Sequence, residues 1–208
     1  MTLAQDNLVS MKLIVIGNSY AGKSCLIRSY ESGKFMSNYL STIGLDFLKK
    51  KINLTNNKEA ILNVWDTAGQ ERFQALTMNY LKRTDGILLC VALNDDNYIQ
   101  QLKYWFDKVQ DVLDETEIQI LIVGTKCDLV NDRAIIEFKK SVASEFNNKY
   151  QCEITSAKQF MGVDKAFKTI ANMIIKSKQE LEDLEIKSLR TFKADKTLNN
   201  KEKTKKCC

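Results

Sequence analysis

The most constraining feature of the chain is the run Gly17-Asn18-Ser19-Tyr20-Ala21-Gly22-Lys23-Ser24, which fits the pattern G-x-x-x-x-G-K-[ST]. An apolar stretch, Met11 to Ile16, precedes it, and a helical pattern follows. The backbone N–H groups of such a loop point at an anion, and the loop opens onto the partly positive N-terminus of a helix. The run therefore predicts a phosphate-binding loop, in which Lys23 reaches the outer phosphates and Ser24 places its hydroxyl on Mg²⁺.

Length and composition narrow the class of protein. A chain of 208 residues holds one ordinary domain with an appendage. It has no apolar stretch of about 20 residues and no signal pattern in its first ten residues, so we expect a cytosolic protein. The chain has no histidine, which excludes Ser-His-Asp triads and His-ligated zinc. Phosphoryl transfer is not excluded, because it depends mainly on positioning and on charge stabilisation by Mg²⁺, Lys and backbone donors.

The six cysteines form neither a disulfide framework nor a zinc site, because four are scattered and only Cys207 and Cys208 are adjacent. The net charge of +5 is concentrated at the C-terminal end. Residues 187–208 carry eight Lys or Arg against two acidic residues, which leaves residues 1–186 at −1. We therefore expect no nucleic-acid partner for the body, whereas the basic tail suits an anionic surface.

Apolar runs at 12–16, 86–93 and 118–123 are typical of buried parallel strands. Helical spacing of apolar residues recurs over 99–113 and 163–174, and strands alternating with helices predict a parallel α/β sheet. Segments 45–54 and 60–65, joined by a short polar turn, predict a hairpin that adds one antiparallel strand. From about residue 185 apolar residues are too sparse to bury a helix face, which predicts a mobile tail. We divide the chain into a domain at 10–176 and a basic tail at 177–208.

A second motif, Trp65-Asp66-Thr67-Ala68-Gly69-Gln70-Glu71, follows a predicted strand. Asp66 is placed to hold Mg²⁺ through water. Gly69 offers an amide without a side chain to a terminal phosphate, and Gln70 can orient an attacking water. Such a D-x-x-G segment alone usually marks a turn, but behind a phosphate loop it predicts nucleotide hydrolysis.

Two further motifs follow later strands. In Thr125-Lys126-Cys127-Asp128 the carboxylate can accept paired N–H donors from a guanine edge, which adenine lacks. Thr155-Ser156-Ala157-Lys158 offers backbone amides and a lysine stem around the same base. Because ligands of open α/β sheets gather at the carboxyl ends of the strands, the order of these motifs predicts one guanine-nucleotide site.

With these motifs the chain resembles the Ras-like small GTPases, and within them the Rab family, over about residues 10–176 and again at the C-terminus. Segments 41–47 and 65–73 look strongly like Rab signatures. The resemblance implies a P-loop GTPase domain with a six-stranded, mostly parallel sheet, one antiparallel strand, helices on both faces and a disordered tail. It also implies Mg²⁺ at Ser24, Thr42 and Asp66, and catalysis by Gln70 and Lys23. The nucleotide-binding set it implies is Gly17, Asn18, Ser19, Tyr20, Ala21, Gly22, Lys23, Ser24, Cys25, Phe35, Tyr39, Thr42, Gly69, Thr125, Lys126, Asp128, Ser156, Ala157 and Lys158.

The same resemblance implies an effector surface and a lipid anchor. Phe47, Trp65 and Tyr80 match the aromatic trio that presents the nucleotide state to effectors. Cys207 and Cys208 resemble the double-cysteine ending that Rab proteins have geranylgeranylated, and two lipid chains suffice for stable anchoring. The implied partners are effectors, an exchange factor, a GTPase-activating protein, and prenylation and membrane-extraction chaperones. We expect a monomer on the cytosolic face of an intracellular membrane.

The sequence thus favours a GDP/GTP switch that binds Mg-GTP, hydrolyses it slowly and recruits effectors in vesicle trafficking. Two alternatives stay open, a non-hydrolysing guanine-nucleotide-dependent binding module and a metabolic P-loop phosphotransferase. Three positions depart from the family pattern. Thr125 replaces an Asn that braces the phosphate loop, and Leu81 begins an unusual continuation of the second switch. Tyr20 replaces a small residue, and its ring lies either over the phosphate or ribose edge of the nucleotide or in solvent.

Overall fold

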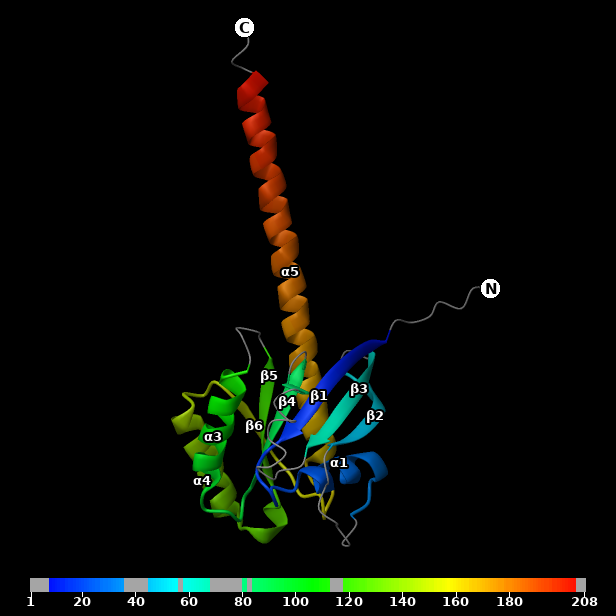
Figure 1. Cartoon of the computed structure of the whole chain (residues 1–208), viewed down its shortest axis with the longest axis vertical. Coiled ribbons are helices and arrows are strands. Elements are labelled where there is room, and N and C mark those ends of the chain that lie inside the picture. The colour runs from blue at the N-terminus through cyan, green and yellow to red at the C-terminus, as the bar shows by residue number, and fades with distance from the viewer. Residues whose placement is uncertain are drawn as a thin grey trace, which may run out of the picture. The chain divides into compact units, whose positions relative to one another are not determined.

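The computed structural model describes residues 8–35, 45–55, 58–67, 80–81, 84–112 and 118–204, with side chains described up to residue 184. Figure 1 shows a single twisted sheet with helices packed around it. Its strand order is β2-β3-β1-β4-β5-β6, and only β2 is antiparallel to its neighbour. This confirms the predicted mostly parallel six-stranded sheet with one antiparallel strand. The strands are β1 Val9–Ile16, β2 Leu45–Asn53, β3 Glu59–Thr67, β4 Gly86–Ala92, β5 Gln119–Thr125 and β6 Gln151–Ile154.

The central strands are covered on both faces, which explains their continuous apolar runs. Every residue of β4 is buried. On one face the core joins α3 (Tyr98–Gln110) and α4 (Asp132–Glu145) to the sheet, with Ile14 of β1 among its members. On the other face a Cβ added to Gly86 would meet Leu13 of β1 and Ile170 of α5. The residues of β1 therefore alternate between two helical layers, as a central parallel strand requires.

Helices α1 (Lys23–Ser32) and α5 (Val163–Thr204) lie together on that second face. The rings of Tyr30 and Phe167 stack with centroids 3.8 Å apart. Lys50 of β2 donates to the Tyr30 carbonyl and lies 4.0 Å from the centroid of its ring. These contacts fix α1, and therefore the loop that precedes it, against the sheet.

The helical backbone of α5 continues to Thr204, beyond residue 185, where the sequence predicts a mobile tail. The segment has no proline and its commonest residue is Lys, a good helix former, so its local propensity allows a helix although it lacks a continuous apolar stripe. The chain forms two compact units, residues 1–174 and 175–208. Within the described part of the chain, no helix combines the length and apolar character needed to cross a membrane.

Candidate functional site

The predicted phosphate loop joins the end of β1 to the start of α1. Gly17 has φ 142°, and a Cβ there would lie 2.2 Å from the carbonyl oxygen of Cys90, a distance that no side chain could occupy. Gly22, with φ 81°, precedes the first residue of α1. The close contact at Gly17 requires glycine and the left-handed backbone at Gly22 favours it, so the loop can run close against β4.

Lys23, the first residue of α1, is only 5% exposed. Its Nζ donates to the carbonyl oxygens of Gly17 at 2.8 Å and Asn18 at 2.9 Å, so the ammonium group spans the loop. Burial lowers the pKa of Lys23, and the nearby Cys90 and Asp66 partly oppose that shift. A buried cation held by two carbonyls beside a helix N-terminus is suited to an anionic ligand.

Two side chains from other elements, Thr125 and Trp105, form hydrogen bonds to the phosphate loop. The hydroxyl of Thr125, at the end of β5, donates to the Ala21 carbonyl at 2.7 Å and lies 3.1 Å from the Val91 carbonyl. The indole of Trp105 in α3 donates to the side chain of Asn18 at 2.8 Å. Thr125 thus braces the loop through its hydroxyl, which is the task that the resemblance gives to the Asn it replaces.

Ser24 and Asp66 are both buried at the same edge of the sheet. Asp66 is in register with Val15 of β1, and the next residue, Thr67, donates its hydroxyl to the Val15 carbonyl at 2.7 Å. The end of β3 is thereby fixed beside the start of the phosphate loop. A hydroxyl and a carboxylate beside a phosphate loop are the hard oxygen donors that Mg²⁺ prefers, so these residues fit that ion.

The predicted base-binding motifs meet at the ends of β5 and β6. Asp128 lies in the short 3-10 helix η2 (Cys127–Leu129), and the buried hydroxyl of Ser156 donates to its Oδ1 at 2.6 Å. The Thr155 carbonyl accepts from the Cys127 N–H at 3.2 Å, which ties the two loops together. Ala157 accepts from Ser29 of α1 at 3.0 Å. The carboxylate is therefore oriented before any base is bound.

Other predicted nucleotide contacts lie around this edge. Lys126 has a left-handed backbone with φ 56°, and its Cε is 3.9 Å from a Cβ built on Gly22, so its stem runs along the phosphate loop. Cys25 is half-buried in α1, whereas Phe35 and Lys158 are exposed. The structure thus brings the phosphate loop and the base-binding loops together. The side chains of Phe35 and Lys158 lie on the surface.

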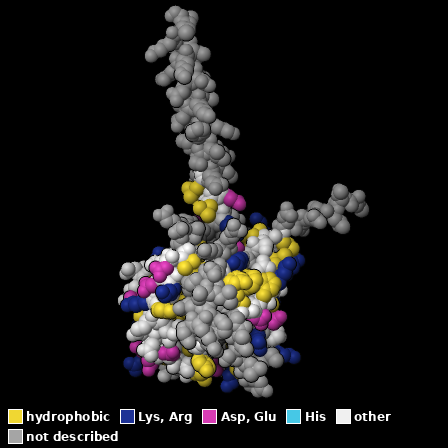
Figure 2. Space-filling view, in the orientation of Figure 1, with side chains coloured by type: hydrophobic (Ala, Val, Ile, Leu, Met, Phe, Trp, Pro, Cys, Tyr) yellow, Lys and Arg dark blue, Asp and Glu magenta, His cyan; other side chains and the backbone are white. Residues whose placement is uncertain are grey.

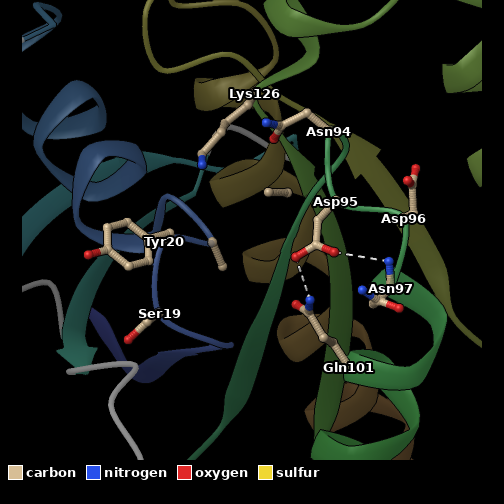
Figure 3. A pocket seen from close by; sticks show the side chains of 10 residues that line it. Ser19, Tyr20, Asn94, Asp95, Asp96, Asn97, Gln101 and Lys126 are labelled. Carbon is tan, nitrogen blue, oxygen red and sulfur yellow. Dashed lines mark hydrogen bonds between the residues drawn. The ribbon is translucent and has the colours of Figure 1, made fainter.

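A cavity of about 400 Å³ lies between the phosphate loop and the start of α3. Figure 3 shows Tyr20 and Lys126 on one side of it and Asp95 with Gln101 on the other. Asp95 accepts from the Asn97 N–H at 2.9 Å and from the Gln101 amide at 2.7 Å, and these bonds lower its pKa. The Tyr20 side chain is 86% exposed. Apart from Tyr20, Ser19, Ala21 and Lys126, the sequence patterns did not indicate the lining of this cavity.

The three aromatic residues predicted to contact effectors, Phe47, Trp65 and Tyr80, lie in contact with one another in the fold. Phe47 and Trp65 face each other across β2 and β3 with ring centroids 5.0 Å apart, and Trp65 and Tyr80 are 4.9 Å apart. Phe47 is 48% exposed, and the other two are half-buried. Figure 2 shows hydrophobic side chains gathered beside Lys and Arg over β1–β3. This partly exposed aromatic surface is unlike an ordinary core cluster.

Several predicted residues lie outside the described part of the chain. They are Tyr39, Thr42, Gly69, Gln70, Cys207 and Cys208. Sequence patterns alone did not point to Trp105 or Ser29 as supports of the site. Trp105 fits the apolar stripe of α3 and Ser29 is an ordinary helix residue, so nothing local distinguishes a side chain whose partner is 87 or 128 positions away.

Comparisons with known proteins agree with this geometry. The chain matches the Ras family over residues 12–176. It is 38% identical to GTP-binding protein YPT1 of Saccharomyces cerevisiae over 168 residues, which cover 80% of this chain and 79% of that protein. It is 35% identical to GTP-binding protein ypt2 of Schizosaccharomyces pombe over 100% of this chain and 99% of that protein. It is 37% identical to Ras-related protein Rab-1C of Dictyostelium discoideum over 80% and 82%.

Proposed function

This chain belongs to the Rab family of Ras-like small GTPases, and on that premise we propose that its described site holds Mg-GTP and that the protein is a lipid-anchored switch. As a member of this family it binds GTP and GDP, hydrolyses GTP and acts in vesicle trafficking, with regulators and effectors as partners. The assignment of residues to these tasks is our proposal. The phosphate loop is the observation that carries it, because the buried Lys23 lies across a loop whose backbone requires glycine at Gly17.

We assign the phosphates of the nucleotide to the backbone amides of residues 17–25 and to Lys23. Two of the three N–H donors of the Lys23 ammonium lie on the Gly17 and Asn18 carbonyls, and on phosphate binding the third would donate to a phosphate oxygen. Ser24 and Asp66 would hold Mg²⁺, the latter through water. When bound, Mg²⁺ neutralises charge that develops on the phosphate oxygens during transfer.

The proposal extends to three residues outside the described ranges, on the basis of family membership and sequence motif. Thr42 completes the Mg²⁺ ligands and, with the Gly69 amide, senses the γ-phosphate. Gln70 orients the attacking water. A positioned water reacts slowly until an arginine stabilises the transition state, and a GTPase-activating protein is expected to supply that stabilisation.

Base selection is assigned to Asp128, with Lys126, Ala157, Lys158 and Phe35 around the purine. The Ser156 hydroxyl occupies one carboxylate oxygen of Asp128, which orients the group so that it can accept N–H donors from guanine. Adenine presents no such donor pair, so it would leave the free oxygen of this half-buried carboxylate without its partners.

Membrane attachment and partner binding complete the proposal. The aromatic trio Phe47, Trp65 and Tyr80 would contact effectors, with its partial exposure and mutual ring contacts in support. Cys207 and Cys208, at the end of the basic tail at 177–208, would carry the two lipid chains. We further propose that the domain at 10–176 works as a monomer on the cytosolic face of an intracellular membrane.

The experiment is a single-turnover assay of the purified protein loaded with Mg-GTP or Mg-ATP. We expect slow hydrolysis of GTP and no loading with ATP. Gln70→Leu should lower the hydrolysis rate at least 10-fold while GTP still binds, because water positioning is lost. Gln110→Leu, an exposed glutamine in α3, is the matched control. Preferential ATP loading would favour the phosphotransferase, and GTP binding without turnover the binding module; the comparisons favour neither alternative.

A further inference from the structure

Trp105 is a buried indole directed at the phosphate loop. Its side chain is 3% exposed and lies in the core cluster with Leu102, Phe106 and Val109 of α3. The indole nitrogen lies 2.8 Å from Oδ1 of Asn18. Because an indole N–H only donates, the amide group of Asn18 must present its oxygen. Core packing therefore fixes the donor, and the donor fixes the rotamer of Asn18.

Asn18 is also the residue on which the loop closes. Its backbone carbonyl accepts from the Ala21 N–H at 3.2 Å and from the Nζ of Lys23 at 2.9 Å. The side chain held by Trp105 and the carbonyl held by Lys23 thus belong to one residue. A shift of Asn18 would move a carbonyl that contacts the cation.

The geometry points to Trp105 as a positioning residue for nucleotide binding, which keeps the phosphate loop in its binding conformation by holding Asn18. Trp105 itself does not contact the nucleotide. The inference rests on the proposed guanine-nucleotide site and deepens it. A loop that is ordered before the ligand arrives loses less entropy on binding, so breaking this bond should accelerate nucleotide release.

The experiment measures the release of a fluorescent GDP analogue from the full chain in Mg²⁺ buffer. Trp105→Phe removes the donor and keeps an aromatic ring, and Asn18→Ala removes the acceptor. We expect each variant to release GDP about 5-fold to 30-fold faster, as expected for losing one hydrogen bond to a buried group. The double variant should release it no faster than the faster single variant, because both changes remove the same interaction. Fully additive rates would overturn the inference.

Phe106→Leu separates positioning from general destabilisation. Phe106 neighbours Trp105, lies in the same core cluster and has no polar atom, so its replacement weakens packing alone. We expect a loss of unfolding stability at least as large as in Trp105→Phe but GDP release at the wild-type rate. Equal acceleration of GDP release in Phe106→Leu and Trp105→Phe would show a merely structural role and overturn the inference.

A spectroscopic measurement tests the bond itself. The chain has two tryptophans, so the indole N–H resonance that is missing from Trp105→Phe belongs to Trp105. We expect slow hydrogen exchange of this resonance in the wild type and faster exchange in Asn18→Ala; the same exchange in both would overturn the inference. A wild-type protein that holds no guanine nucleotide would overturn the proposed function as well. Tight GDP binding in the wild type, with the same release rate in Trp105→Phe, would overturn this inference alone.

Discussion

Tyr20 is the most unusual residue of the phosphate loop. It has a left-handed backbone with φ 64° and an exposed ring at the rim of the cavity that Lys126 also lines. A non-glycine residue in this conformation stores strain, which is typical of functional sites. The exposed ring is free to cover a bound nucleotide at its phosphate or ribose edge.

We therefore predict that Tyr20→Gly releases GDP roughly 2-fold to 10-fold faster, since an aromatic contact contributes about 0.5–1.5 kcal/mol. Its unfolding free energy should change by less than about 1 kcal/mol, because relief of backbone strain offsets the greater freedom of glycine when unfolded. Stopped-flow measurement of GDP release checks this, with Tyr20→Phe as the control that keeps the ring. An unchanged release rate in Tyr20→Gly would place the ring in solvent.

Cys90 gives a prediction about pH. Burial raises the pKa of its thiol from 9.0 to about 12. The unfolded thiol ionises above its ordinary pKa while the folded one stays neutral, so unfolding releases a proton in this interval. The stabilisation is complete below pH 9 and falls as pH rises, by up to about 1.4 kcal/mol per pH unit. Cys90→Ala should lack this slope in urea unfolding between neutral pH and about pH 11. If the difference in unfolding free energy between wild type and Cys90→Ala is the same at every pH in that range, the prediction is contradicted.

At the scale of elements, Thr125 joins β5 to β4 and to the phosphate loop. Thr125→Val keeps the shape of the side chain but removes the hydroxyl that donates to the Ala21 carbonyl and lies 3.1 Å from the Val91 carbonyl. We expect a loss of about 1–3 kcal/mol in unfolding stability and faster GDP release, because the buried Ala21 carbonyl loses its hydroxyl donor. Thr125→Ser, which keeps the hydroxyl, should stay close to the wild type. Chemical unfolding and GDP release are measured on the wild type and on both variants. Equal unfolding free energies and release rates in Thr125→Val and Thr125→Ser would contradict the prediction.

The elements that the sequence predicts well are those with a strong local pattern. The apolar run at 86–93 corresponds to β4, and the segments 45–54 and 60–65 correspond to β2 and β3, whose pairing is antiparallel. The site residues at the ends of β1, β3, β5 and β6 were predictable because motif spacing is local. The residues that support the site, Trp105 and Ser29, could not be predicted from the sequence. Their bonds to Asn18 and Ala157 depend on which helix packs against which loop.

At the scale of the whole molecule, the chain has two compact units, 1–174 and 175–208, close to the proposed boundary at 176. A chain ending at residue 176 should keep the unfolding temperature and GDP release rate of the full protein, because the described site lies within the first unit. The truncated chain should lose binding to phosphatidylserine vesicles at low salt, since each basic residue near such a surface contributes about 1 kcal/mol. Vesicle sedimentation of both unprenylated proteins checks this. Equal vesicle binding, or unfolding of the truncated chain, would contradict it.

The central claim is that this fold holds a guanine nucleotide through its phosphate loop and Asp128. The most direct test is to purify the native full chain in Mg²⁺ buffer, denature it and identify the released nucleotide by chromatography. The account predicts GDP or GTP at close to one molecule per chain, and a much lower guanine content in Asp128→Ala. Recovery of adenine nucleotide, or of no nucleotide from the wild-type protein with Mg²⁺ present, would contradict it.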